Sequence, residues 1–244
     1  MKAAVISDIH SNVFALEAVL KAIDQENIDR IFVLGDIFGY YPWAVETYDI
    51  LSDRPCVFIK GNHDHLVETC DERVSTPWYF DLVVHNRHEL VTRRPEALSW
   101  LSKMGFSQRI TLDHLEVNLI HGSPLDPANG RIYPDYFEKL SADEMRLLSW
   151  MPAGNEIVLL GHTHYPFCFR TTKNGIVANP GSIGQPRDGN PMPSWGILDS
   201  SSSAFYLRRS DYDYMHVIEI LNSSNWNARA TKALAKNYIG TLKY

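Results

Sequence analysis

The sequence predicts an α/β fold, because five short aliphatic runs each end abruptly in polar residues and helical patterns separate the early ones. Such runs are typical of strands buried on both faces of a sheet. The runs are Ala3–Ile6, Ile31–Leu34, Val57–Ile59, Val117–Ile120 and Ile157–Leu160. Residues just past the carboxyl ends of such strands line the ligand crevice of open α/β sheets, so we expect the functional site there.

Helices are expected between the early runs and in the tail. Apolar residues recur at helical spacing from Asn12 to about Glu26, and Trp43–Leu51 follows Pro42, which suits a first helical turn. Further helices are expected over Pro77–His88, Pro95–Met104 and Trp226–Leu242.

Two hairpins are expected in the later half, one around the turn Asn174-Gly175 and one around the serine-rich turn Ser200–Ser203. Their strands are Phe167–Thr172 with Ile176–Ala178, and Trp195–Leu198 with Ala204–Leu207. No stretch is long enough for a linker, so a single domain is expected over residues 1–244, with residues 76–104 interpreted as a small helical cap.

Composition excludes several classes of protein. The 244 residues, 45% hydrophobic and 21% charged, suit one large globular domain. A net charge of −6 argues against a protein that binds nucleic acid non-specifically. Cys56, Cys70 and Cys168 are odd in number and widely spaced, which indicates a reducing compartment. With no signal-peptide pattern or membrane-length apolar run, a cytoplasmic location is expected.

The polar residues that end the five runs combine carboxylate oxygens with imidazole nitrogens. That mixture suits manganese, iron, zinc, cobalt or nickel better than calcium or magnesium. In an extended segment Asp8 and His10 would point to one side, with Ile9 turned to the core. The endings are Asp8-Ile9-His10, Gly35-Asp36, Gly61-Asn62-His63-Asp64, His121-Gly122 and Gly161-His162-Thr163-His164.

Charge favours two divalent ions at this site. Asp8, Asp36 and a bridging hydroxide would contribute three negative charges against four positive ones, while the remaining ligands are neutral when bound. The net positive charge would favour an anionic phosphate and its transition state.

The ordered series DxH, GD, GNHD, H-G and GHTH resembles the calcineurin-like metallophosphoesterase superfamily, and DIHSNVFALEAVL, GDIFGYYP and NPGSIGQPRDG resemble its small bacterial and archaeal branch. The resemblance extends from Met1 to about Asp213. One motif alone would be weak, but five in order, each after an apolar run, are specific. The resemblance implies a four-layer αββα sandwich of two mixed β-sheets flanked by helices.

The resemblance also implies a role for each motif residue. The site would hold two divalent transition-metal ions, with manganese as the first candidate. Asp36 would bridge both ions. Asp8, His10 and His164 would hold the first metal, and Asn62, His121 and His162 would hold the second. His63 would give a proton to the leaving group, and Asp64 would orient and charge its imidazole. The candidates for binding the substrate's phosphate are Asn12, Gln185 and Arg187.

The implied activity is hydrolysis of a phosphomonoester or phosphodiester by the bridging hydroxide. The substrate would be a phosphate-ester small molecule, a nucleotide such as a dinucleoside polyphosphate, or a phosphoprotein; no stable nucleic-acid binding and no membrane are expected. A non-catalytic metal-binding scaffold is the alternative, represented in the superfamily by a retromer subunit that lacks the equivalent of His63. A nuclease is the third, although such members usually carry extra domains and basic surfaces.

Several candidates also have ordinary explanations. Asp64 could cap the turn that follows it, Arg187 could be a solvated loop residue, and Asn179–Ser182 could be only a turn. Aromatic residues near the motifs are expected to pack rather than bind substrate, and they are Tyr40, Tyr41, Trp78 and Tyr79. The sequence carries no signal for the oligomeric state.

Overall fold

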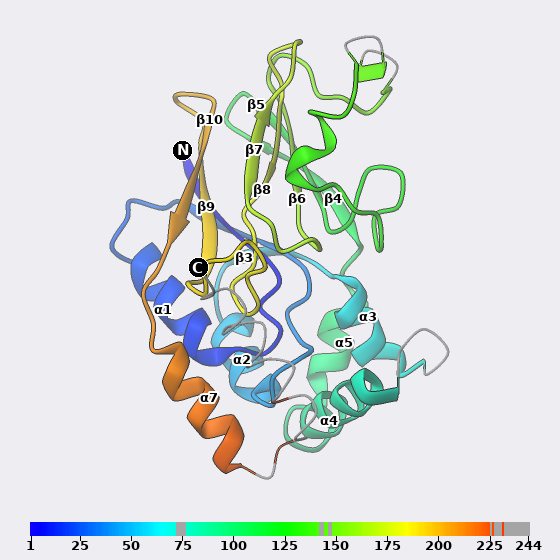
Figure 1. The fold of residues 1–244 in the computed structure, drawn as a ribbon, viewed down its shortest axis with the longest axis vertical. Coiled ribbons are helices and arrows are strands. Elements are labelled where there is room, and N and C mark those ends of the chain that lie inside the picture. The colour runs from blue at the N-terminus through cyan, green and yellow to red at the C-terminus, as the bar shows by residue number, and fades with distance from the viewer. Residues whose placement is uncertain (72–76, 142–143, 146–147, 225, 227–230, 232–244) are drawn as a thin grey trace.

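The computed structural model describes residues 1–71, 77–141, 144–145, 148–224, 226 and 231. Two mixed five-stranded sheets pack face to face, with helices against their outer sides (Figure 1). The predicted α/β sandwich of two mixed sheets flanked by helices is therefore confirmed. The closing helix expected over Trp226–Leu242 lies outside the described residues, apart from Trp226 and Thr231.

The first sheet has the strand order β10-β9-β1-β2-β3. Its strands are β1 (Lys2–Ile6), β2 (Arg30–Leu34), β3 (Cys56–Ile59), β9 (Ser194–Asp199) and β10 (Ala204–Arg209). β1, β2 and β3 run parallel, whereas β9 is antiparallel to β1 and to β10. The third aliphatic run was expected to be a central strand, and this is wrong, because β3 is at the sheet edge and is only partly buried.

The second sheet has the order β4-β5-β6-β8-β7. Its strands are β4 (Ser107–Leu112), β5 (Leu115–Ile120), β6 (Glu156–Leu160), β7 (Phe167–Arg170) and β8 (Ile176–Asn179). The five aliphatic runs thus divide between the sheets, with β1 to β3 in one and β5 and β6 in the other. β4 was not predicted, because it is a mostly exposed edge strand that carries little apolar signal.

Side chains alternate across each strand, as the two-residue period of a strand requires. Ala3 and Val5 of β1 point between the sheets, where Val117 of the second sheet joins them. Ala4 and Ile6 point the other way, toward the helices. The first sheet is therefore buried on both faces.

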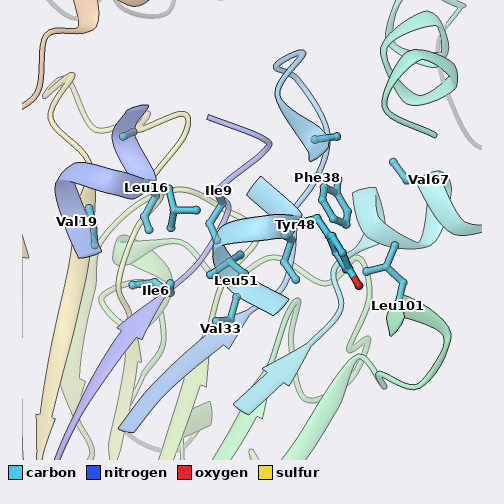
Figure 2. Packing of buried hydrophobic residues seen from close by; sticks show 14 of the residues in the cluster. Ile6, Ile9, Leu16, Val19, Val33, Phe38, Tyr48, Leu51, Val67 and Leu101 are labelled. Carbon is cyan, nitrogen blue, oxygen red and sulfur yellow. The ribbon is translucent and has the colours of Figure 1, made fainter. Parts of the chain in front are cut away.

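Helices cover the outer face of the first sheet. They are α1 (Val13–Ile23), α2 (Ala44–Ser52), α3 (Asn62–Thr69), α4 (Pro77–Arg93) and α5 (Glu96–Ser102), whereas α7 (Tyr214–Ser223) packs with Tyr41 in a separate cluster. Figure 2 shows Leu16 of α1 and Leu51 of α2 near Ile6 and Val33, and Leu101 of α5 beside Tyr48 in the same core. The segment interpreted as a cap therefore contributes to the main core. None of the described helices has both the length and the apolarity to span a membrane.

The outer face of the second sheet is covered by the chain between β5 and β6. That connection includes the short 3₁₀ helix η2 (Pro134–Tyr136). Phe137 and Met151 from the same connection pack on Val158 and Phe167 of the sheet.

Loops at the carboxyl ends of the strands meet between the two sheets. Asp8 N donates to Gly35 O at 3.0 Å, which joins the loops after β1 and β2. Gly161 N donates to His121 O at 2.9 Å, which joins the loops after β6 and β5. His121 Nδ1 lies 2.7 Å from Leu34 O and so connects the second sheet to the first. The polar ends of strands from both sheets therefore meet in one place.

Candidate metal centre

Several loop residues at this place have a backbone conformation that side chains disfavour. Left-handed φ angles between 52° and 67° occur at Asp8, His10, Asp36, His162 and His164. Each such residue costs on the order of 1–3 kcal/mol and persists only where surrounding contacts enforce it. Strain of this kind gathers at functional sites, which supports a functional role for these loops.

The extended-segment explanation for Asp8 and His10 is wrong. Both residues are left-handed rather than extended, with φ angles of 53° and 54°. His10 N donates to Asp36 O at 2.9 Å, which holds this turn against the neighbouring loop. Their side chains still reach the same place, and Ile9 is fully buried in the core as expected.

Asp8 has one oxygen held by the protein and one oxygen free. Oδ2 accepts from Ser7 Oγ at 2.6 Å and from His162 N at 3.0 Å. Oδ1 is buried without a hydrogen-bond partner in the described structure and lies 3.2 Å from His164 Nε2. His10 Nε2 lies 3.8 Å from the same oxygen and 3.1 Å from His164 Nε2. These three side chains converge as one group that could hold a metal ion.

Asp36 has the same division between its oxygens. Oδ1 accepts from His63 N at 2.8 Å, whereas Oδ2 is buried and has no hydrogen-bond partner among the described residues. Oδ2 lies 3.8 Å from His10 Nε2 and 3.4 Å from His121 Nε2. A single oxygen thus faces both the first group and a second one.

The second group gathers around His121. Asn62 Oδ1 lies 3.1 Å from His121 Nε2. Ligand atoms of Asp36, His121 and His162 all lie within 4.8 Å of one another. All seven residues predicted as ligands are therefore placed in one cluster.

The chemistry of this donor set fits two cations. A buried carboxylate oxygen without a hydrogen-bond donor is costly, and the unpaired oxygens of Asp8 and Asp36 each face imidazole nitrogens. Oxygen and imidazole donors together suit divalent transition metals. Gly61 allows the close packing that this needs, since a Cβ on it would lie 2.0 Å from Asp36 Oδ1.

Two histidines are oriented by backbone carbonyl groups. His121 Nδ1 lies 2.7 Å from Leu34 O, and His164 Nδ1 lies 2.6 Å from Gln185 O. A proton on Nδ1 donates to the carbonyl oxygen, which leaves Nε2 directed at the centre, the usual arrangement of histidine ligands.

Charges within the centre shift its pKa values. Burial alone would raise the pKa of both Asp8 and Asp36, but the facing imidazoles outweigh it and hold both values below the ordinary range. Burial lowers the pKa of His162 to about 4. Burial acts in the same direction on His121, but Asp36 outweighs it and raises the pKa of His121 to about 9.

Residues 1–203, which include all seven residues predicted as ligands, match the sequence model of the calcineurin-like phosphoesterase superfamily domain. The chain belongs to the calcineurin-like phosphoesterase superfamily. The resemblance inferred from the five motifs is therefore confirmed.

Relatives of similar length support this assignment to the calcineurin-like phosphoesterases. The uncharacterized protein MJ0912 of Methanocaldococcus jannaschii is 29% identical over 231 residues, covering 88% of this chain and 90% of that protein. Phosphodiesterase YfcE of Escherichia coli is 25% identical over 214 residues, covering 82% and 88%. The crystal structure of a metallophosphoesterase from Sphaerobacter thermophilus is 26% identical, with a TM-score of 0.74 and coverage of 97% and 100%.

His63 of this calcineurin-like phosphoesterase lies beside the two groups of predicted metal ligands. Its Nε2 is 3.9 Å from Asp36 Oδ2, and its ring centroid is 4.6 Å from that of His10. Burial lowers the pKa of His63 to about 4. The hydrogen-bond partner of His63 Nδ1 is the hydroxyl of Tyr79, a residue that was expected to pack rather than bind.

Asp64 faces backbone amides in the structure. Its Oδ1 accepts from Phe38 N at 2.9 Å and its Oδ2 accepts from Gly61 N at 2.9 Å, which ties the start of α3 to the loop after β2. Burial, followed by repulsion from Asp36, raises the pKa of Asp64 to about 7. These contacts match the alternative in which Asp64 caps a turn. Any support that Asp64 gives to the His63 imidazole would therefore come from fixing the backbone at the start of α3.

The three predicted phosphate-binding residues take different places. Asn12 Oδ1 caps α1 by accepting from Ala15 N at 3.2 Å. Gln185 supports His164 through its backbone carbonyl, and its Oε1 accepts from Arg187 Nη2 at 2.8 Å. Arg187 is exposed and reaches Tyr40 Oη at 3.5 Å. Because the Tyr40 ring packs on His10 and His63, Arg187 lies at the rim of the centre.

Two further residues near the centre were missed. Arg131, on the chain between β5 and β6, donates from Nε to His162 Nε2 at 3.2 Å. Asn86 on α4 is fully buried; its Nδ2 bonds the carbonyls of Gly39 and Tyr41 at 3.0 Å each, and its Oδ1 accepts from Ser11 Oγ at 2.7 Å. No motif marks either residue, because each acts through contacts between distant segments.

Replacing Asn86 with alanine should lower the free energy of unfolding by about 3 kcal/mol, because several buried backbone and hydroxyl groups would lose their partner. Chemical denaturation of the metal-free protein measures this change. Asn222→Ala, on the exposed side of α7, is the matched control and should change stability by less than about 0.5 kcal/mol. A loss below about 1 kcal/mol for Asn86→Ala would show that α4 is not anchored as described.

Proposed function

We propose that the protein is a dinuclear metal-dependent hydrolase of a phosphomonoester or phosphodiester. The observation that supports this best is the unpaired Oδ2 of Asp36, which lies 3.8 Å from His10 Nε2 and 3.4 Å from His121 Nε2. An unpaired carboxylate oxygen between two groups of donors is suited to bridge two ions.

In this proposal each group of ligands takes one ion, manganese being the first candidate. Asp8, His10 and His164 would hold one, Asn62, His121 and His162 the other, and Asp36 both. When bound, two such ions supply a hydroxide nucleophile near neutral pH and neutralise charge on the phosphate oxygens.

The protein's own groups would hold and protonate the substrate. Arg187 has a long cationic side chain at the rim of the centre. Its planar guanidinium can bind two phosphate oxygens. His63, whose Nε2 faces the centre, would donate its proton to the leaving oxygen. The buried first group, where Asp8 and His10 are 0% exposed, excludes bulk water and strengthens electrostatic contacts.

The relatives favour testing a diester first, because YfcE is called a phosphodiesterase. A phosphate-ester small molecule or nucleotide remains the proposed substrate class, with phosphoproteins as the larger alternative.

The three cysteines are free in the structure, which accords with the predicted cytoplasmic location.

Metal titration tests the proposal against the scaffold alternative. Metal-stripped protein would receive Mn²⁺ while hydrolysis of bis(p-nitrophenyl) phosphate and p-nitrophenyl phosphate is followed. We expect a rate that rises with Mn²⁺ and saturates at two equivalents. Binding of two ions without any metal-dependent rate on either ester, or on a wider set of nucleotides and phosphopeptides, would support the scaffold.

Mn²⁺ binding at pH 8 should release about two protons per protein, one from His121 and one from the water that becomes hydroxide. His121, with its pKa raised to about 9, is mostly protonated at that pH and must become neutral to bind, whereas His162, with its pKa lowered to about 4, is already neutral. The release should therefore shrink as pH rises above 9. Calorimetry in buffers of different ionisation enthalpy measures the number of protons. Release that does not change between pH 8 and pH 10 would argue against His121 as a ligand.

A further inference from the structure

Two exposed side chains on the connection between β5 and β6 lie beside the predicted ligands. Arg131 and Tyr133 are exposed, whereas Ile132 between them is only 4% exposed and packs with the core of the second sheet's outer face. Tyr133 has extended backbone angles, with φ −89° and ψ 163°. Because side chains alternate along an extended segment, Arg131 and Tyr133 point away from the core on the same side.

The loop before this segment starts at His121 and is closed on itself. Gly130 N donates to Asp126 O at 2.9 Å, and a Cβ on Gly122 would lie 2.8 Å from the same nitrogen. The two ends of the loop are therefore in close contact, with no room for a side chain between them. Arg131 follows this closed loop directly, so its backbone keeps a defined place relative to the strand end that carries His121.

Both exposed side chains contact the loop after β6, which carries two predicted ligands. Arg131 Nε donates to His162 Nε2 at 3.2 Å. The Tyr133 ring forms an edge-to-face pair with Tyr165, the residue after His164, with ring centroids 5.7 Å apart and 71° between the planes. The segment therefore borders the second group of predicted ligands with one cation and one aromatic ring.

The Tyr133 ring has a surface on which a flat group can stack. In an edge-to-face pair the partner covers at most one face of a ring. Tyr133 is 41% exposed, so a face that Tyr165 does not cover is open to solvent. Exposed aromatic side chains next to basic groups bind nucleobases and similar rings by stacking.

Arg131 and a metal ion would use the same lone pair of His162. The Nε2 atom of a neutral imidazole has one lone pair, so it cannot accept from the guanidinium while it binds an ion. In the metal-loaded protein the Arg131 guanidinium would lose this acceptor and lie beside the centre, where it can bind two phosphate oxygens. Arg187 reaches Tyr40, whose ring packs on His10 of the first group. The two arginines would thus bind the substrate beside different ligand groups.

We propose that Arg131 and Tyr133 form a substrate subsite beside the second group of predicted ligands. Arg131 binds phosphate oxygens, and Tyr133 stacks on an aromatic ring that the ester carries. The substrate class is then a phosphate ester with an aromatic group, and a nucleotide has this chemistry. The inference rests on the proposed hydrolase function for the reaction, whereas binding at the subsite can be measured without turnover.

Calorimetry with two phosphonates tests the subsite, because neither compound has an ester bond to hydrolyse. Methylphosphonate and benzylphosphonate differ by one aromatic ring. We expect the Mn²⁺-loaded wild type to bind benzylphosphonate about tenfold more tightly than methylphosphonate. Tyr133→Ala should abolish this preference and leave the affinity for methylphosphonate within about twofold of the wild-type value. Arg131→Ala should weaken the binding of both compounds about tenfold.

Tyr206→Ala on β10 and Arg109→Ala on β4 change exposed residues of the same types and are the controls, which should bind both phosphonates as the wild type does. A wild type without the preference, or a preference that persists in Tyr133→Ala, overturns the aromatic subsite. Unchanged affinities in Arg131→Ala, or loss of bound manganese from that variant, overturn the role of Arg131 in binding phosphate. If no ester is hydrolysed but the preference depends on Tyr133, the hydrolase function fails and the subsite stands.

Discussion

Asp36→Asn should reduce turnover by a factor on the order of 10³ or more and leave fewer than two ions bound. Asp36 Oδ2 faces both groups of predicted ligands, at 3.8 Å from His10 Nε2 and 3.4 Å from His121 Nε2. Asparagine can still accept from His63 N through Oδ1, so the loop should keep its shape. What is lost is the negative charge between two cations.

Three measurements separate this loss from unfolding. Elemental analysis gives the ions bound per chain, steady-state assays give kcat, and thermal unfolding with and without Mn²⁺ shows whether the ion stabilises the fold. Mn²⁺ should raise the melting temperature of the wild type more than that of Asp36→Asn. Asp81→Asn, the same change at an exposed position of α4, is the control and should behave as the wild type. Two bound ions with more than about a tenth of the wild-type turnover would contradict the bridging role.

His63→Ala should keep both ions and lose turnover mainly on esters with poor leaving groups, by about 10²–10⁴-fold. The histidine is adjacent in sequence to the proposed ligand Asn62, yet its Nδ1 is engaged by Tyr79 and its Nε2 faces the centre. An aryl leaving group departs without a proton, so an aryl ester should lose far less activity.

The comparison uses one alkyl and one aryl phosphate ester, with metal content measured on the same samples. His65→Ala is the control, because His65 lies two residues away on α3 and is exposed. Unchanged hydrolysis of the alkyl ester by His63→Ala would remove the proton-donor assignment. Loss of the ions would instead mean that His63 acts as a ligand.

Sequence could predict which side chains gather at this centre because the information is local. Each predicted ligand follows an aliphatic run. The carboxyl ends of these strands meet between the two sheets, which brings Asp36 Oδ2 within 3.4 Å of His121 Nε2. The backbone at these residues could not be predicted. Asp8 and His10 were expected to be extended, but the loop after β1 is held in a left-handed turn by Gly35 O and Asp36 O, contacts from a loop some 27 residues away.

The surroundings of the ligands depend on tertiary packing and so left no local signal. Tyr79 reaches His63, and Asn86 reaches Ser11, only because α4 packs across the loops after β1 and β2. The carboxylate of Asp64 was assigned to the imidazole from its position in the GNHD motif, yet the geometry of the α3 start directs it to Gly61 N and Phe38 N.

The most direct measurement is a crystal structure of the Mn²⁺-loaded protein with anomalous difference maps collected at the manganese edge. We predict two peaks about 3.5–4 Å apart, each within coordination distance of Asp36. One peak should also contact Asp8, and the other should contact His121. A single peak, or two peaks that share no ligand, would contradict a dinuclear centre bridged by Asp36.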